Sequence, residues 1–203
     1  MSQDFSDLSK TAFLIVDLQN DFLDPRGAYG RGGASIPEIA ALPARLAPLA
    51  RKIRARGGLV GATQFTLVPG RHGEPIISPH LKELRPFLAK GDFAPGGWGH
   101  ALVDVLQPAD FLIEKVAYSA FYMTRLEWML RKLNVERLIV AGIVTNGGVA
   151  STVRDAHVRD IPVTVLSDGC AAFTPAIHDV SIEALRPVAQ VATVQETLTA
   201  VSG

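Results

Sequence analysis

The sequence has 203 residues, of which 48% are hydrophobic and 20% are charged. A chain of this length buries one sizeable core but is too short for two ordinary domains, so we expect a single domain over residues 1–203. Twenty basic side chains balance twenty acidic ones, and the resulting formal net charge of zero gives no electrostatic reason to expect nucleic acid or an anionic membrane as a partner. The composition therefore favours a small-molecule substrate.

The N-terminal residues and the cysteine content indicate the compartment. Residues 1–10 are polar and acidic, lack the basic start and apolar stretch of a secretory signal, and are expected to form a flexible segment. No apolar run approaches the roughly 18 residues of a membrane span. The single cysteine, Cys170, cannot form an intramolecular disulfide, which agrees with a reducing compartment. We therefore expect a cytoplasmic protein.

Short apolar runs alternate with longer segments of helical character. The runs lack polar alternation, which is typical of strands covered on both faces. The predicted strands are 12–16, 59–62, 111–114, 138–142, 163–166 and 188–192. Apolar residues at three- and four-residue steps predict amphipathic helices. These helices are 36–56, 123–133, 149–158 and 194–201. The alternation predicts an α/β fold, a Rossmann-like three-layer α/β/α sandwich with about six mostly parallel strands.

Two segments break this alternation. Residues 21–33 and 65–99 are rich in glycine and proline, and long irregular segments inside a compact domain are commonly functional. Both segments follow predicted strands. Since ligands of parallel α/β sheets bind beyond the carboxyl ends of the strands, we expect these segments to border the site.

Two charged residues end apolar strands at that edge. Asp17 closes the first strand and Lys115 the third. A charge that ends an apolar strand is costly unless it is paired, so we favour a functional role for Asp17 over a loop-capping one. A nearby Lys115 would hold the carboxylate ionised until substrate arrives. Glu114 is expected to point to the opposite face of the sheet.

A glycine pair, Gly147 and Gly148, follows the fourth strand and precedes a helix. Its amides would point into the ligand edge and could hold an oxyanion or a carbonyl oxygen, while a tight turn that needs glycine explains the pair equally well. Neither a GxGxxG nor a GxxxxGK[ST] motif is present, so no nucleotide cofactor is expected.

Together these segments resemble the isochorismatase-like superfamily, also called cysteine hydrolases. The resemblance spans about residues 11–201. Its first motif is Asp17 with the QNDF of residues 19–22, and its second is Lys115 with the YSAF of residues 118–121. The third motif follows the fourth strand. It comprises Gly142, Thr145, Asn146, Val149, Thr152, Arg154, Asp155 and Ala156.

The resemblance places Gly148 at the position of the family's catalytic cysteine. Acyl-enzyme formation on a thiolate is therefore closed to this chain. Cys170 follows the next strand and is interpreted as a small buried residue. True isochorismatases carry glycine here and hydrolyse a vinyl ether with the aspartate as general acid.

The resemblance thus implies a hydrolase of an enol ether such as isochorismate, with Asp17 as the acid. Two alternatives remain open. One is an amide or ureide hydrolase that activates water without a cysteine, and the other is a catalytically silent binding homologue. The run Val144, Thr145 and Asn146 matches the amidohydrolases rather than the isochorismatase branch. The segment after Gln64 has no clear match to the substrate-binding arginines of that branch, for which Arg71 and Arg85 are candidates by position only.

The resemblance also implies substrate-binding residues. Gln64 resembles a substrate-binding glutamine, Val144 and Thr145 are expected to be joined by a cis peptide bond, and Gly147 lies beside the nucleophile position. Aromatic candidates for the pocket wall are Phe22, Trp98, Tyr118 and Phe121. Core packing competes with the pocket for these aromatics, and only for Trp98 do we prefer the pocket.

No metal is expected, because Phe-Thr-Leu at residues 65–67 replaces the Asp-x-His cluster of the nicotinamidases and the histidines lack ligand-like spacing. The resemblance also implies a homo-oligomer.

Overall fold

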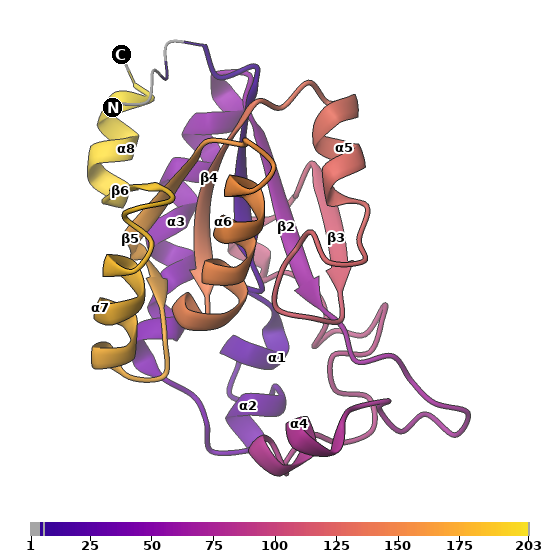
Figure 1. Cartoon of the computed structure of the whole chain (residues 1–203). Coiled ribbons are helices and arrows are strands. Elements are labelled where there is room, and N and C mark those ends of the chain that lie inside the picture. The colour runs from indigo at the N-terminus through magenta and orange to yellow at the C-terminus, as the bar shows by residue number, and fades with distance from the viewer. Residues whose placement is uncertain (1–4, 6, 203) are drawn as a thin grey trace.

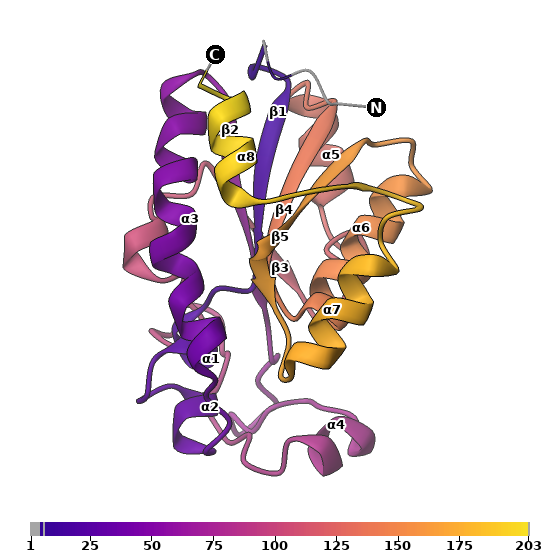
Figure 2. The ribbon, with the colours of Figure 1, turned by 90° about the vertical axis from the view of Figure 1, so that its left-hand side faces the viewer.

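The computed structural model describes residues 5 and 7–202, which form three layers with a sheet between two groups of helices (Figures 1 and 2). The sheet has six strands in the order β3-β2-β1-β4-β5-β6, and every pairing is parallel. The strands are β1 (Thr11–Val16), β2 (Leu59–Phe65), β3 (Phe111–Lys115), β4 (Arg137–Ile143), β5 (Val163–Ala171) and β6 (Gln190–Ala192). The predicted Rossmann-like α/β/α sandwich is confirmed.

Helices cover both faces of the sheet. One face carries α3 (Pro37–Ala55), α8 (Val194–Ala200) and the 3-10 helix η1 (Asp104–Leu106). The other carries α5 (Leu126–Lys132), α6 (Ala150–His157) and α7 (Pro175–Glu183). Beyond the carboxyl ends of the strands lie α1 (Asn20–Leu23), α2 (Ala28–Arg31), α4 (Pro79–Leu84) and the π-helical turn η2 (Thr145–Val149) (Figures 1 and 2). Within the described ranges, no helix is both long and apolar enough to cross a bilayer.

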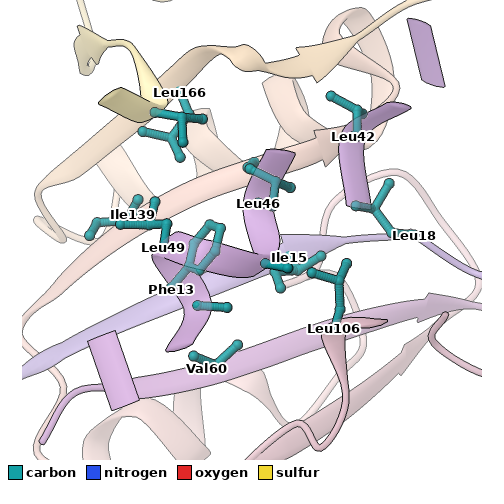
Figure 3. Packing of buried hydrophobic residues seen from close by; sticks show 14 of the residues in the cluster. Phe13, Ile15, Leu18, Leu42, Leu46, Leu49, Val60, Leu106, Ile139 and Leu166 are labelled. Atoms are coloured by element: carbon teal, nitrogen blue, oxygen red, sulfur yellow. The ribbon is translucent and has the colours of Figure 1, made fainter. Parts of the chain in front are cut away.

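The central strand β1 shows why the apolar runs become buried strands. All six of its residues are buried, and successive side chains enter opposite cores. Phe13 and Ile15 pack under α3 with Leu46 and Leu49 (Figure 3), whereas Leu14 faces the α5 and α6 side. Because the strand packs against an apolar layer on each face, its side chains are apolar on both faces and do not alternate with polar ones.

The order of the strands locates the ligand edge. After β1 the chain builds β2 and β3 on one side, then crosses to place β4 on the other side of β1. The carboxyl ends of β1 and β4 therefore flank the topological switch point, where ligands of open α/β sheets bind.

Several boundaries differ from the sequence expectation. Helix α7 was not predicted, because among its residues only Ile182 is buried and it presents no apolar stripe. Its start nevertheless carries a local signal: Thr174 accepts a hydrogen bond from the Ile177 N–H, and Pro175 occupies the first helical position. The segments expected to be irregular contain α1, α2 and α4, each of at most six residues.

The N-terminal segment is also corrected in part. Phe5 and Leu8 are buried in the core beneath α3, and Lys10 pairs with Glu136, so residues 5 and 7–10 belong to the packed domain. Residues 1–4 and 6 of the segment predicted to be flexible lie outside the described residues.

Truncating Leu46 should test the core between α3 and the sheet. Leu46 is fully buried against both, so Leu46→Ala should lower the free energy of unfolding by about 2–5 kcal/mol in urea denaturation. The matched control is Arg51→Ala on the exposed side of the same helix, which should change it by less than about 0.5 kcal/mol. Equal effects of the two variants would contradict this packing.

Candidate active site

Asp17 is the first residue beyond β1, and its backbone is held in an unusual conformation. Its φ of 57° lies in the left-handed region, which residues other than glycine rarely adopt. Thr63 of β2 fixes it from the neighbouring strand: the Asp17 N–H donates to Thr63 Oγ1 at 3.1 Å, and that hydroxyl donates to Asp17 Oδ1 at 2.5 Å. Strain tolerated at such a position is typical of a functional site.

Lys115 ends β3 and reaches past β2 to the same carboxylate. Its Nζ donates to Asp17 Oδ2 at 2.6 Å and to the Ala117 carbonyl at 3.1 Å. The two side chains are only 1% and 7% exposed, so this is a buried ion pair. The positive charge of the ammonium group therefore lies in direct contact with the carboxylate.

Gly148 completes the group from β4. It lies in the turn η2, and a Cβ atom at this position would lie 3.3 Å from Asp17 Oδ2 and 2.8 Å from the Ile143 carbonyl oxygen. A side chain at position 148 would therefore point at the carboxylate. The structure thus brings Asp17, Lys115 and Gly148 together from three strand ends.

The turn itself differs from the expectation at two points. The predicted cis bond between Val144 and Thr145 is wrong by one residue, because the cis peptide bond joins Ile143 to Val144. The Gly147 N–H donates to the Val144 carbonyl at 2.9 Å, so this amide closes the turn instead of facing a ligand. A Cβ at Gly147 would lie 3.0 Å from Val144 Cγ2, which supports the tight-turn interpretation for Gly147.

A cavity of about 370 Å³ opens beside these groups. The aromatic side chains of Phe22, Tyr29, Phe65, Tyr118 and Phe173 form much of its wall. Its volume falls in the range of small-molecule sites, and its lining of apolar rings with a few charged groups is typical of them.

Of the predicted site residues, six line this cavity. They are Asp17, Lys115, Gly148, Phe22, Tyr118 and Val144. The other five predicted residues do not line the cavity. They are Gln64, Trp98, Phe121, Thr145 and Gly147.

Each excluded side chain has a partner elsewhere. Gln64 Nε2 donates to the His100 carbonyl at 2.8 Å, and Thr145 Oγ1 lies 2.8 Å from His178 Nδ1. Phe121 is buried in the core on the α5 side. Trp98 is 49% exposed, with the Arg26 guanidinium 4.7 Å from its ring centroid, which corrects our preference for the pocket.

Sequence reasoning missed Tyr29 and Phe173 as cavity residues. Of the two arginines named by position, Arg85 lines the cavity and Arg71 does not. Tyr29 and Arg85 come from the two glycine- and proline-rich segments, and Phe173 follows β5. The composition of these segments indicated that they border the site, but without a repeating pattern it did not indicate which side chains turn inward.

The QND residues that follow Asp17 hold these segments in place. Gln19 Nε2 donates to the Phe65 and His100 carbonyls at 3.0 and 2.9 Å, and Gln19 Oε1 accepts the Phe65 N–H at 2.7 Å. Asp21 accepts the Ala28 and Phe93 N–H groups at 3.0 and 2.6 Å. None of these contacts involves the cavity carboxylate, so these residues support the site without forming it.

Cys170 does not replace the missing thiol. It is buried within β5, and burial raises the pKa of its thiol to about 12, so the reactive thiolate is not populated near neutral pH. Among residues 5 and 7–202, no group of three or more His, Cys, Asp or Glu side chains is arranged to hold a metal ion.

His100 adds a pH-dependent element to the support of the cavity. Its Nε2 lies 2.8 Å from Thr66 Oγ1, and burial lowers its pKa below the usual 6.5. At pH values between the folded and unfolded pKa, the unfolded chain binds more protons, so stability rises with pH and falls as pH drops below 6.5.

We expect the free energy of unfolding to decrease from about pH 7.5 to about pH 5.5, and His100→Gln to reduce that slope, because glutamine does not titrate. Urea denaturation at both pH values measures the slope. His157→Gln, an exposed histidine, is the control and should leave it unchanged. An identical slope in wild type and His100→Gln would contradict the assignment.

Comparison with known proteins places these features in a family. Residues 11–196 match the family described as the isochorismatase domain. The ureidoacrylate amidohydrolase RutB of Methylorubrum extorquens AM1 is 34% identical over 185 residues, 85% of this chain and 75% of the relative. RutB of Stutzerimonas stutzeri A1501 is 34% identical over 171 residues, 79% and 69% of the two chains.

Solved structures show the same fold. A cysteine hydrolase from Pseudomonas syringae pv. phaseolicola superposes with a TM-score of 0.81 at 24% identity, covering 100% of this chain and 99% of its own. N-carbamoylsarcosine amidase from Thermoplasma acidophilum superposes with a TM-score of 0.70 at 23% identity, covering 91% and 96%. With the family match over residues 11–196 and the 34% identical relatives, the chain belongs to the isochorismatase family of hydrolases.

Proposed function

We propose that this chain hydrolyses a small amide or ureide by direct attack of water, with Asp17 as general base. Two relatives that are 34% identical over most of both chains are named ureidoacrylate amidohydrolases, which supports this substrate class over an enol ether. In this proposal Lys115 keeps the base ionised, and Gly148 leaves the nucleophile position to water.

The observation that carries the proposal is the geometry around one carboxylate oxygen. Asp17 Oδ2 lies 2.6 Å from Lys115 Nζ and 3.3 Å from the place where a Cβ of residue 148 would lie. A water molecule bound beside Gly148 would therefore be within hydrogen-bonding reach of an ionised carboxylate, as a general base requires.

The reaction then needs no covalent intermediate. Asp17 takes a proton from water as the water oxygen forms a bond to the carbonyl carbon, and the carbonyl oxygen becomes an oxyanion. The protonated Asp17 returns that proton to the nitrogen as the C–N bond breaks. A primary amide yields ammonia and a carboxylic acid, and a terminal ureide yields ammonia and a carbamate. The positive charge of Lys115 stabilises negative charge that develops in the cavity.

Enol-ether hydrolysis, the first expectation from the sequence, becomes the second candidate. Gly148 favours it, because that reaction uses no thiol. It requires Asp17 to hold a proton when substrate binds, and the contact with Lys115 at 2.6 Å opposes that state. A catalytically silent homologue would bind substrate and release no product.

The homo-oligomer implied by the family resemblance stays a prediction that light scattering would test.

Purified protein should release ammonia from members of a panel of small amides and ureides, and Asp17→Asn should lower kcat/KM by at least about 100-fold, because the general base is lost. Asp179→Asn, an exposed carboxylate, is the matched control and should retain activity. Since Asp17→Asn leaves Lys115 buried without a partner, circular dichroism must show it folded. The double variant Asp17→Asn with Lys115→Met should also be inactive, and it contains no unpaired buried charge at this site.

The same preparation mixed with isochorismate separates the candidates. Ammonia from the panel without pyruvate from isochorismate supports the amide or ureide reaction. Pyruvate release that depends on Asp17 would transfer the assignment to the enol ether, and no product from any compound would leave the silent homologue.

Substitution at Gly148 tests the nucleophile position. Gly148→Ala places a methyl group where the attacking water is proposed to bind, and its Cβ would lie 2.8 Å from the Ile143 carbonyl oxygen, so we expect at least about a tenfold loss of ammonia release. Gly148→Cys places a thiol beside Asp17, and intact-protein mass spectrometry should detect an adduct with the amide substrate.

Wild type is the control for the adduct, because the thiol of Cys170 has a pKa of about 12 and should not react. Unchanged activity of a folded Gly148→Ala would contradict the position proposed for water.

A further inference from the structure

A second cavity, of about 220 Å³, lies beside the carboxyl end of β5. Part of its lining is apolar and comes from Ile36, just before α3, and from Ala171, Ala172 and Pro175 between the end of β5 and the start of α7. Charged side chains from α3 and β5 also line it. None of the residues with a role in the proposed reaction belongs to this second cavity.

One aromatic side chain separates the second cavity from the cavity that contains Asp17. Among residues 5 and 7–202, Phe173 alone lines both. The two cavities are also linked through the turn η2. His178 lines the second cavity, and its Nδ1 lies 2.8 Å from Oγ1 of Thr145, the first residue of the turn that carries Gly148. The second cavity is therefore a direct neighbour of the Asp17 cavity, and the two meet at the ring of Phe173.

The ring of Phe173 is held in place from two sides. It stacks on the ring of Tyr29, with the centroids 5.8 Å apart and the planes 9° from parallel, and the Arg85 guanidinium carbon lies 5.2 Å from its centroid. Along the chain, Phe173 stands between the buried Ala172 and Thr174, the N-cap residue of α7. Stacking and an anchored backbone together keep the ring between the two cavities.

We propose that Phe173 determines the upper length of the substrate, because its ring ends the Asp17 cavity and closes off the second cavity as an extension of the same site. A chain that runs from the reacting carbonyl towards Phe173 meets the ring and has no further space. Without the ring, the chain would continue into the second cavity along Ala171 and Ala172. Since each buried methylene group contributes about fourfold to affinity, chain length is the property that the ring discriminates.

This inference deepens the proposed function and rests on it for the reaction, but not for binding. The competing explanation is that Phe173 only packs, since it also contacts the hydrophobic clusters on either side. The two roles differ in what a substitution does. Loss of packing alone weakens short and long ligands alike, whereas loss of a partition between cavities favours long ligands over short ones.

The experiment measures ammonia release from linear primary amides, acetamide to octanamide, and from monoalkylureas, methylurea to hexylurea. For wild type, kcat/KM should rise with chain length and then fall once the chain reaches Phe173. Phe173→Ala should raise kcat/KM for octanamide and hexylurea by at least about tenfold, the effect of two newly buried methylene groups. It should change kcat/KM for acetamide and methylurea by less than about threefold.

Two further variants show whether the gain comes from the second cavity. Phe87→Ala is the matched control, because the Phe87 ring also contacts Tyr29, at 5.1 Å between centroids, but lines neither cavity. It should keep the length profile of wild type. The double variant Phe173→Ala with Ile36→Trp fills the second cavity from its far end and should restore the limit on chain length. Circular dichroism must show every variant folded.

Binding provides a readout that does not depend on turnover. In thermal denaturation, octanamide should raise the melting temperature of Phe173→Ala by more than that of wild type, and butanamide should raise both equally. A crystal structure of Phe173→Ala with octanamide should show the chain in the second cavity. If no compound is hydrolysed but the length-dependent shift is present, the proposed reaction fails while the role of Phe173 stands.

The inference is overturned by a wild type that hydrolyses short and long compounds equally well. A folded Phe173→Ala with the length profile of wild type, and no added thermal shift with octanamide, would also overturn it. So would an equal gain for octanamide in the double variant with Ile36→Trp, because the second cavity would then not be its source. If Phe173→Ala does not fold, Phe173→Val replaces it and the same outcomes apply.

Discussion

The buried ion pair between Asp17 and Lys115 is the interaction on which the site depends. Either charge alone would cost several kcal/mol to bury, so each requires the other. The fold meets this requirement because parallel strands end at one edge: β1 delivers the carboxylate, β3 the ammonium group, and β2 between them supplies Thr63 for the second carboxylate oxygen. Asp17 leaves its strand with a φ of 57°, so the pairing is kept at the cost of backbone strain.

Residues that follow Asp17 hold in place the segments that form a cavity beside this ion pair. Gln19 and Asp21 are buried polar side chains whose hydrogen bonds go to backbone groups at the end of β2 and in the long segment between β2 and β3. Buried polar groups need such partners, and backbone groups of an irregular segment need them equally. The motif around Asp17 therefore combines the carboxylate proposed to react with neighbours that hold the cavity wall in place. Phe22 and Phe65 line the cavity from the two segments that these hydrogen bonds join.

The strand ends were predictable from the sequence, and the inward-facing loop residues were not. Apolar runs in the sequence located the six strands. Asp17, Lys115 and Gly148 lie at or after the ends of three of these runs, and the parallel topology places all three at one edge of the sheet. Tyr29, which lines the cavity, lies in a segment without periodicity, where only tertiary packing decides which way a side chain points. The prediction that Trp98 lines the pocket was wrong for the same reason. Its glycine-rich surroundings indicated a loop but not which way the ring points, and the ring lies against Arg26 at the surface.

The charge of one carboxylate separates the two candidate reactions. In the proposed amide or ureide reaction, the contact with Lys115 compensates the charge of Asp17, which then acts as a base. An enol-ether mechanism would reverse this condition, since a protonated Asp17 would leave the buried charge of Lys115 uncompensated. The protonation state of one carboxylate therefore separates the two candidate reactions. Gly148 is compatible with either state, so the contact between Asp17 and Lys115, rather than the missing thiol, distinguishes them.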